Sequence, residues 1–453
     1  FVKACHDKKI KVIFDGVFNH TGRDFFAFKD IQQNRENSRY LNWYCNVNFW
    51  GNNEYNDGFS YDNWGGYNLL VKLNQRNPEV QDYICDVIRY WVSEFDVDGI
   101  RLDAADVLDF DFMRALRHTA EEVKPDFWLM GEVIHGDYSR WVNGETLQSV
   151  TNYALHKALY SGHNDHNYFE IAHTVKYLQN MGNLDLYNFV DNHTKLSNKA
   201  HFTPVHILLY TLPGIPSIYY GSEFGIEGRK ERSSDDSLRP ALNITDYKDA
   251  VTSNPCTALI TALGKIRQHT PALSYGSYTE LQLTNRQYAF ARDLDNMRVI
   301  ITVNNDDNDA WMNLPAGNAA EYVGTLTGQK VAVEGGCINV CVGANSGEIW
   351  VPTEDTSVPE TFSENKDSIV EETPVTQEEV KNEGSAETKT APASSIPEAA
   401  STKEDTDRTP ASAEKEPVNF DSNKAPEDMS IEELQAGILA KMATNGSVTD
   451  QMK

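Results

Sequence analysis

The sequence predicts an α/β fold of the (β/α)₈ barrel type, followed by an antiparallel β-sandwich. Four short apolar runs each lead into polar residues, at 10–16 (IKVIFDG), 97–103 (VDGIRLD), 128–133 (WLMGEV) and 186–190 (LYNFV). A (β/α)₈ barrel presents its catalytic side chains at the carboxyl ends of its parallel strands. From about residue 277 the pattern changes to short alternating runs, which are typical of antiparallel strands.

The spacing of the polar residues predicts two further strands. Asp103 and Glu132 are 29 positions apart, about one unit of a barrel that divides roughly 250 residues among eight βα units. Glu132 and His193 are 61 positions apart, or about two units, so a strand is expected within 148–153, where QSVTNY stands. The run at 214–221 (GIPSIYYG) predicts the next strand.

About six of the eight barrel strands are therefore expected, in a barrel domain that covers residues 1–276. Residues 1–9 (FVKACHDKK) resemble the last turns of a helix that leads into the strand at 10–16. We expect an N-terminally truncated barrel with unpaired strand edges, which are prone to aggregation. A closed eight-stranded barrel would contradict this expectation.

Helical periodicity is clearest at residues 78–95. Val80, Ile84, Val87, Ile88 and Trp91 recur at helical spacing, and Pro78 suits a first turn, so a packed amphipathic helix is predicted. A second helical pattern covers residues 256–268. Between the first strand and the helix at 78–95, about 55 residues are rich in Asn, Gly, Tyr and Trp.

The C-terminal β-sandwich is expected at residues 277–351. Its predicted strands are YTELQL, QYAFARD, MRVIITVNN, EYVGTL, CINVCV and GEIWV, separated by Asn, Asp and Gly turns. Cys337 and Cys341 have the same parity on the strand CINVCV, so they should share a face, and a structural role is favoured for both.

Composition predicts a disordered acidic linker at residues 352–428. Residues 353–428 contain 20 acidic and 7 basic residues, with Phe362 and Phe420 as their aromatics, so this segment cannot bury enough apolar area to offset its ordering entropy. At 429–453 a short helix and tail are expected, since SIEE at 430–433 has capping-box form. Its apolar stripe could dock on a partner or on the protein itself, or the segment could be a frayed tail.

Charge and cysteine usage exclude several classes of function. The net charge of −27 argues against nucleic acid or an anionic membrane as a partner. The six cysteines lack CxxC spacing, so neither a zinc site nor a disulfide framework is indicated, and reduced thiols are expected. No apolar run is long enough to span a bilayer.

The polar motifs form one ordered series: Asp15-x-x-x-Asn19-His20, Arg101-x-Asp103, Glu132 and Asn192-His193. In order and spacing, this series resembles the α-amylase family (glycoside hydrolase family 13) over about residues 1–350. Lys72-Leu73-Asn74 and the run EVIH at 132–135 are most similar to the neopullulanase, cyclomaltodextrinase and maltogenic amylase group. The resemblance implies that the Asn- and Trp-rich stretch, about residues 21–75, is an excursion domain inserted after a barrel strand.

Two carboxyl groups about 5 Å apart are needed to hydrolyse a glycosidic bond with retention of configuration. Asp103 suits the nucleophile and Glu132 the general acid. Arg101 projects from the same strand face as Asp103 and can hold that carboxylate ionised and oriented. Glu132 has to be protonated near neutral pH, which calls for an apolar or anionic neighbourhood. A single carboxylate at a strand end could equally cap the next helix, but the three residues together favour catalysis.

The resemblance implies roles for other residues. Those expected to bind substrate are His20, Arg101, His193, His135, Asn192 and Trp64, and those expected to support the site structurally are Asp15 and Asn19. Aromatic side chains suit sugars because pyranose faces stack on them. The inserted segment has five candidate aromatics for such stacking: Trp43, Trp50, Tyr61, Trp64 and Tyr67. One or two of them are expected to touch substrate, and the others to form local core.

The sequence departs from the family pattern after Asn192-His193. The family continues with an Asp that stabilises the transition state, whereas this chain continues with Thr194-Lys195. Because the residues from Leu196 resume in family style, the difference resembles a small deletion. Removing one member of a concerted catalytic set costs on the order of 10⁴ in rate in a protease triad, so reduced activity is an open alternative.

Three functions follow from the resemblance. The first is a retaining α-glucan hydrolase that cleaves α-1,4 and also α-1,6 bonds in maltooligosaccharides, cyclodextrins or pullulan. The alternatives are a carbohydrate-binding pseudoenzyme and a transglycosylase. No cofactor is required and no metal ligand is assigned, although the resemblance allows calcium near Asn19. It also implies α-glucan oligosaccharides as partners, a homodimer of the full-length parent and a cytoplasmic location.

Overall fold

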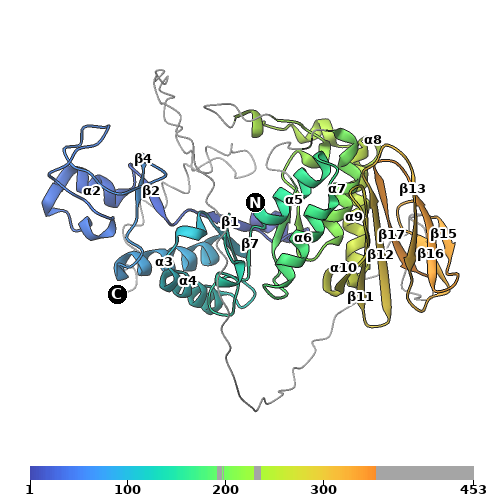
Figure 1. Ribbon diagram of the computed structural model, residues 1–453. Helices are drawn as coiled ribbons and strands as arrows, with labels where there is room; N and C mark the ends of the chain where they lie inside the picture. Colours follow the sequence, from blue (N-terminus) through green and yellow to red (C-terminus); the bar gives the residue numbers. More distant parts are fainter. Residues whose placement is uncertain (191–195, 197, 229–235, 354–453) are drawn as a thin grey trace, which may run out of the picture. The chain divides into compact units, whose positions relative to one another are not determined.

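A computed structural model of the protein describes residues 1–190, 196, 198–228 and 236–353 (Figure 1). All of these residues belong to one compact unit that spans Phe1–Thr361. The predicted C-terminal helix lies outside the described residues, as does the predicted acidic linker apart from its first two residues.

Six parallel strands follow one another in sequence order. One sheet contains β1 (Ile13–Gly16), β5 (Gly99–Leu102), β6 (Trp128–Gly131) and β7 (Ser149–Val150). A parallel pair contains β8 (Tyr187–Phe189) and β9 (Ile215–Ser217). A parallel bridge between Thr151 and Tyr187 joins the end of β7 to β8. The strands predicted within 148–153 and 214–221 are confirmed as β7 and β9.

Helices alternate with these strands in the order that a βα barrel requires. The α-helices outside the inserted segment are α1 (Val2–His6), α3 (Pro78–Phe95), α4 (Phe110–Val123), α5 (Tyr153–Asn164), α6 (Tyr168–Gln179), α7 (Phe202–Thr211), α8 (Ala250–Ser253), α9 (Pro255–His269) and α10 (Pro271–Tyr275). Short 3₁₀ helices are η3 (Ala105–Val107), η4 (Tyr138–Arg140), η5 (Lys199–His201), η6 (Ser222–Phe224), η7 (Asp236–Leu238) and η8 (Ile244–Tyr247).

Helix α3 begins and ends where the sequence predicts. The Asn77 side chain accepts the Glu79 N–H, and Pro78 occupies the first turn. Asp96 ends the helix in the left-handed conformation, with φ of 55°. The predicted apolar face is buried apart from Trp91, which is half-buried and packs edge-on against Phe14 of β1 at 5.4 Å between ring centroids.

The inserted segment forms a small three-stranded antiparallel sheet with an aromatic core. Its elements are β2 (His20–Gly22), α2 (Phe26–Asn34), η1 (Arg35–Asn37), η2 (Leu41–Trp43), β3 (Asn63–Trp64) and β4 (Tyr67–Lys72). The strand order is β2-β4-β3, with His20 opposite Lys72. Phe28, Phe59 and Tyr61 are buried and pack against one another. Tyr61, one of the five candidate sugar-stacking aromatics, therefore belongs to this local core. A second, Trp43, is buried against Phe26, Tyr40 and Tyr83.

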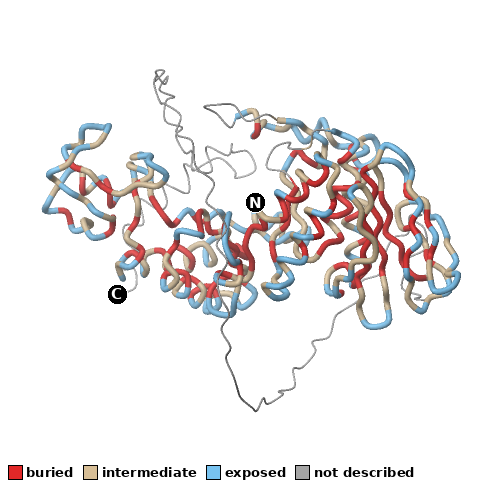
Figure 2. Tube along the Cα trace, in the orientation of Figure 1, coloured by how far each residue is buried: buried red, intermediate tan, exposed pale blue. Residues whose placement is uncertain are grey.

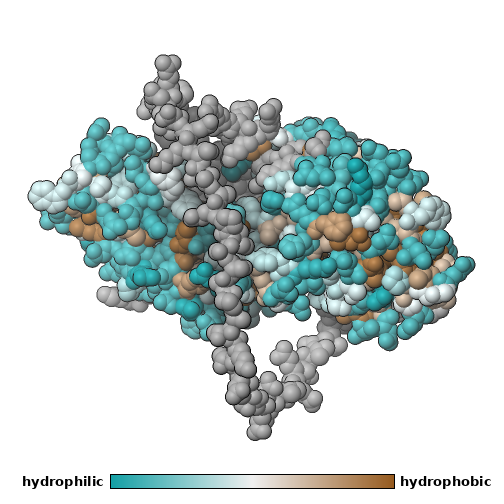
Figure 3. All heavy atoms as spheres, viewed as in Figure 1, coloured by the Kyte–Doolittle hydropathy of each residue, from teal (hydrophilic) through white to brown (hydrophobic). Residues whose placement is uncertain are grey.

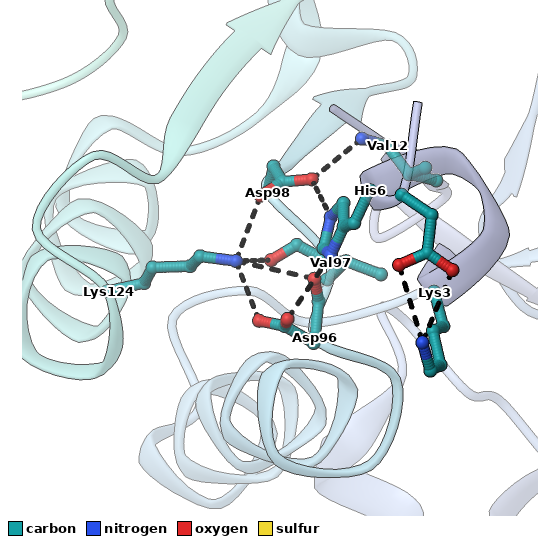
Figure 4. Close-up of polar contacts among 8 residues, drawn as sticks. Lys3, His6, Val12, Asp96, Val97, Asp98 and Lys124 are labelled. Atoms are coloured by element: carbon teal, nitrogen blue, oxygen red, sulfur yellow. Dashed lines mark hydrogen bonds and ion pairs between the residues drawn. The ribbon is translucent and has the colours of Figure 1, made fainter. Parts of the chain in front are cut away.

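Asp98 anchors α1 at the amino ends of the strands (Figure 4). Its carboxylate accepts hydrogen bonds from the Val12 N–H at 2.7 Å and from His6 Nε2 at 2.8 Å, and Lys124 Nζ lies at 2.9 Å. Burial opposes ionisation, but these partners outweigh it and hold the pKa of Asp98 at about 2. In this type of fold, polar clusters at the amino ends of the strands serve stability rather than catalysis.

Residues after the barrel helices form two antiparallel sheets. The larger has the order β10 (Ser277–Leu283), β11 (Gln287–Leu294), β12 (Met297–Asn304), β17 (Ser346–Pro352), β14 (Glu321–Gly324) and β15 (Lys330–Ala332). The smaller pairs β13 (Ala310–Pro315) with β16 (Cys337–Val342). Their facing side chains share one core, which includes Ile300, Trp350, Met312 and Val340.

Strands β13 and β15 were not predicted. β13 (AWMNLP) alternates buried Met312 and Leu314 with exposed neighbours, but the run is short and ends in Pro315. β15 has three residues and none of them is buried.

The red tracing in Figure 2 shows that burial concentrates in the central strands and on the inner faces of the helices.

All six cysteines lie in the described part of the chain and are free there. On Figure 3, hydrophilic residues cover most of the visible described surface. Among the described residues, no helix is long and apolar enough to cross a membrane.

Candidate functional site

The candidate site lies at the carboxyl ends of β1, β5 and β6, where the sequence predicts it. In the parallel register, Asp15 of β1 stands beside Arg101 of β5. The ladder continues past the strands, because the Asp103 N–H donates to Gly16 O at 3.1 Å and the Glu132 N–H to Leu102 O at 2.8 Å. These hydrogen bonds fix the backbone of both predicted catalytic residues on adjacent strands.

One guanidinium connects three carboxylates in this site. Arg101 Nη1 lies 2.5 Å from Asp15 Oδ1 and 3.3 Å from Asp103 Oδ1, and its Nη2 lies 3.0 Å from Glu132 Oε2. The side chains of Asp103 and Glu132 are 25% and 21% exposed, whereas Asp15 is 57% exposed. The two predicted catalytic carboxylates are thus held together in a partly enclosed site by a shared cation.

Electrostatics around Asp103 differ from the sequence-based expectation. Burial raises the pKa of Asp103; Arg101 opposes this shift, and the charges of Glu132 and Asp15 add to it. Arg101 therefore favours the ionised form of Asp103, but burial and the two neighbouring carboxylates together outweigh it. Burial alone would lower the pKa of Arg101, but Asp15, Glu132 and Asp103 together raise it, so the guanidinium stays charged.

Glu132 lies in polar surroundings. Besides Arg101, its Oε2 accepts the Ala104 N–H at 3.3 Å, and its Oε1 accepts a hydrogen bond from the Tyr153 hydroxyl at 3.3 Å. Of the two surroundings expected for a general acid, the apolar one is not what these contacts provide, because the strand ends supply a cation and two donors. The anionic one is supplied by the neighbouring Asp103 and Asp106. Ala104 has φ of 47°, a strained left-handed conformation for a residue with a Cβ.

Tyr153 is a site residue that the sequence reasoning missed. It is the first residue of α5, and the preceding Asn152 caps the helix by accepting the Leu155 N–H at 3.1 Å. Burial, with the negative charge of Glu132, raises the pKa of Tyr153 to about 12, so the hydroxyl remains a donor at neutral pH. The signal was available, since Tyr153 follows a predicted strand at its carboxyl end just as Asp103 and Glu132 do.

Asn19 and His20 lie in a buried amide network beside β2. The Gln75 side chain donates to Asn19 Oδ1 at 3.1 Å and accepts the Asp109 N–H at 2.6 Å. Asn19 is fully buried, and its backbone carbonyl accepts the Leu73 N–H at 3.0 Å. Burial lowers the pKa of His20, so its imidazole is neutral at pH 7. Gln75 was not predicted, because an amide in a loop has no distinctive spacing.

Calcium near Asn19 stays a prediction. The side-chain oxygen of Asn19 already accepts a hydrogen bond from Gln75. Within the described ranges, no group of three or more His, Cys, Asp or Glu side chains could hold a metal ion.

The remaining predicted residues are placed less closely together or are not described. Asp15 contacts Arg101, and its role as a structural support stays a prediction. His135 is exposed after β6, and Trp64 is half-buried on β3, where it pairs with Tyr67. Asn192, His193 and the departure at Thr194-Lys195 lie outside the described residues.

Comparison with known proteins gives a consistent result. The family model "Alpha amylase, catalytic domain" matches residues 1–418. A cyclomaltodextrinase of Thermoanaerobacter pseudethanolicus is 33% identical over 321 residues, covering 67% of this chain and 54% of that protein. Neopullulanase 2 of Thermoactinomyces vulgaris is 28% identical over 351 residues, covering 73% and 58%. An intracellular maltogenic amylase of Bacillus subtilis is 30% identical over 243 residues, covering 51% and 40%.

Solved structures match more than three quarters of the chain. A debranching enzyme of Nostoc punctiforme superposes with a TM-score of 0.66 at 27% identity, covering 78% of each chain. A cyclomaltodextrinase superposes with a TM-score of 0.70 at 24% identity, covering 77% of this chain and 61% of that one. The chain spans between half and three fifths of the length of the first curated relatives that it matches.

Proposed function

Because the chain belongs to the α-amylase family of glycoside hydrolases, with its (β/α)₈ catalytic domain, we propose that its site hydrolyses α-glucosidic bonds with retention of configuration. The observation that carries this proposal is the contact of one guanidinium, Arg101, with both Asp103 and Glu132 at the ends of adjacent strands. A retaining mechanism needs two carboxyl groups close together on either side of the scissile bond.

In the first step, Asp103 attacks the anomeric carbon and forms an ester bond while the glycosidic C–O bond breaks. Glu132 gives its proton to the departing oxygen. In the second step, water attacks the same carbon, passes a proton to Glu132 and releases Asp103 as a carboxylate. The Arg101–Glu132 contact of 3.0 Å has to loosen when Glu132 carries its proton, and Arg101 retains Asp15 as a partner.

The substrates proposed are maltooligosaccharides, cyclodextrins and pullulan, with cleavage of α-1,4 and also α-1,6 bonds. The names of the cyclomaltodextrinase and neopullulanase relatives support this range. His20, Asn192, His193, His135 and Trp64 are proposed to contact the sugar. A homodimer is part of the proposal. So is a cytoplasmic location, supported by the free cysteines and by the intracellular Bacillus subtilis relative.

A second candidate function is glucan binding without turnover. It is favoured by the sequence Thr194-Lys195, which stands where the family pattern has a third carboxylate. Loss of that group would weaken stabilisation of the oxocarbenium-like transition state and leave the contacts of Arg101 with Asp103 and Glu132 in place.

Hydrolysis of maltotriose and β-cyclodextrin by the full chain tests the proposal. We expect Asp103→Asn to lower kcat by about 10⁴-fold and Glu132→Gln by roughly 10²- to 10⁴-fold. Asp126→Asn, at an exposed carboxylate before β6, is the matched control and should leave turnover unchanged. Full turnover by Asp103→Asn would refute the assignment. If the unsubstituted chain binds maltotriose but does not hydrolyse it, the second candidate function is supported.

A further inference from the structure

The inserted segment carries an indole that lies almost entirely in solvent. Trp50 is 98% exposed, whereas the other candidate stacking tryptophans are buried or half-buried. A single exposed apolar side chain is common on protein surfaces and does not define a site by itself. What distinguishes Trp50 is its position beside a polar pocket.

This pocket has a volume of about 420 Å³ and is lined by Asn46, Val47, Asn48, Ser60, Tyr61 and Asp62. Ligand pockets commonly have volumes of roughly 300–1,000 Å³. Within the described hydrogen bonds, the Asn48 amide nitrogen and the Ser60 hydroxyl have no partner, while Asp62 Oδ2 accepts one hydrogen bond, from Asn46 at 2.8 Å. The pocket therefore offers both donors and acceptors to a ligand.

Backbone contacts connect Trp50 to residues that line this pocket. The Trp50 N–H donates to Asn48 Oδ1 at 3.0 Å, and Asn48 and Ser60 exchange backbone hydrogen bonds of 2.8 and 2.9 Å. On the other side of Trp50, a Cβ added to Gly51 would lie 2.3 Å from Ser60 Oγ, so only glycine permits this close approach. The Trp50 backbone is thus held between Asn48, which lines the pocket, and Gly51, which lies against Ser60 of the pocket lining.

We propose that Trp50 and this pocket form an accessory binding site for a glucose unit of an α-glucan chain. A pyranose presents an apolar face that stacks on an indole and an edge of hydroxyls that both donate and accept hydrogen bonds. The carboxylate of Asp62 disfavours a phosphate or another anion. The choice of an α-glucan as ligand rests on the proposed function, whereas the site itself is built wholly from residues 46–62.

The indole N–H signals of the full chain, labelled with ¹⁵N, test this proposal directly. The chain has eight tryptophans, and the Trp50 signal is identified by its loss in Trp50→Ala. Maltoheptaose should shift that signal in a saturable manner, and cellohexaose, its β-linked counterpart, should not. The signal of Trp311, which is 69% exposed on β13, is the matched control and should stay in place.

Titration of maltoheptaose in the Asp103→Asn background supplies the second readout. In isothermal titration calorimetry, Trp50→Ala should lose the saturable step whose midpoint matches the shift of the Trp50 signal in the unsubstituted chain. Trp50→Phe should weaken that step less, and Trp311→Ala should leave it unchanged. An unshifted Trp50 signal at saturating maltoheptaose would overturn the proposal. So would equal binding of maltoheptaose by Asp103→Asn with and without Trp50→Ala. Absence of turnover together with Trp50-dependent binding would refute the proposed hydrolysis and leave this site standing.

Discussion

Arg101 places one positive charge among Asp15, Asp103 and Glu132, so the protonation of the site depends on this residue. Burial and the neighbouring carboxylates both raise the pKa of Asp103, and Arg101 is the group that opposes them. Asp103 acts as a nucleophile only when ionised. The cation therefore sets how far into the acid range the site can work.

Replacing Arg101 with Met tests this dependence through the pH profile. We expect the acid limb of kcat/KM to move to higher pH, because the pKa of Asp103 rises once the guanidinium is gone. At pH 7, kcat/KM should fall roughly 10- to 100-fold, as expected for the loss of a charge-assisted contact. Arg114→Met, on the solvent-exposed face of α4, should leave the profile unchanged. An unshifted acid limb in Arg101→Met would contradict the role given to Arg101.

At this scale the sequence predicted Asp103 and Glu132. It missed Tyr153, which also ends a predicted strand, and Gln75, which lies in a loop. Asp103 and Glu132 were identifiable because each follows an apolar run at the spacing of a βα unit. Tyr153 and Gln75 act through single side-chain contacts with Glu132 and Asn19. Such contacts depend on how helices and loops pack on the strand ends, which periodicity does not encode.

Among the elements, α3 and β13 show what decides whether a sequence pattern is readable. Helix α3 has 18 residues, a side-chain cap, a proline in its first turn and a continuous apolar face, so several local signals agree. β13 has six residues and two buried side chains, and its identity depends on pairing with β16. Short strands that rely on partners distant in sequence are therefore the elements that sequence reasoning misses.

The Asp98 cluster gives a prediction about α1 and the strands that it contacts. The pKa of Asp98 is about 2 in the folded protein, against about 3.9 in an unfolded chain. The ionised form of Asp98 therefore stabilises the fold at pH values above its pKa in the unfolded chain, and this contribution is lost as the pH falls toward 2. By linkage, Asp98→Asn should lower the free energy of unfolding by about 2 kcal/mol at pH 7 and by roughly half as much at pH 3.

Urea unfolding at the two pH values measures this difference. Asp7→Asn is the control, because Asp7 directly follows α1, is exposed to solvent and pairs with the exposed Lys3. Equal destabilisation by Asp98→Asn at pH 7 and at pH 3 would contradict an electrostatic origin.

For the whole molecule, the C-terminal sheets and the barrel helices are linked by a buried arginine. Arg292 of β11 is 1% exposed and donates hydrogen bonds to Gly276 O at 2.8 and 3.1 Å and to Thr211 O, at the end of α7, at 2.6 Å. Burial lowers its pKa to about 10, so it remains charged at neutral pH. A common apolar core, which includes Leu208 and Ile301, spans the same junction.

We expect Arg292→Leu to lower the free energy of unfolding by about 3 kcal/mol, because two buried carbonyl oxygens lose their donors. The unfolding transition should remain a single step, since the apolar core still joins the sheets to the helices. Arg286→Leu, at a partly exposed ion pair with Asp306, is the control and should cost less than about 1 kcal/mol. A loss of similar size in both variants would argue against the role given to Arg292.

The central claim is that Asp103 forms a covalent bond to the sugar, and mass spectrometry of a trapped intermediate tests it most directly. An α-glucosyl fluoride needs no protonation to lose fluoride, so the Glu132→Gln variant should form the glucosyl ester at Asp103 and hydrolyse it slowly. We predict that one glucosyl group is added to the chain and that it maps to the peptide containing Asp103. A label on another residue, or none in Glu132→Gln while the parent chain releases fluoride, would contradict the assignment.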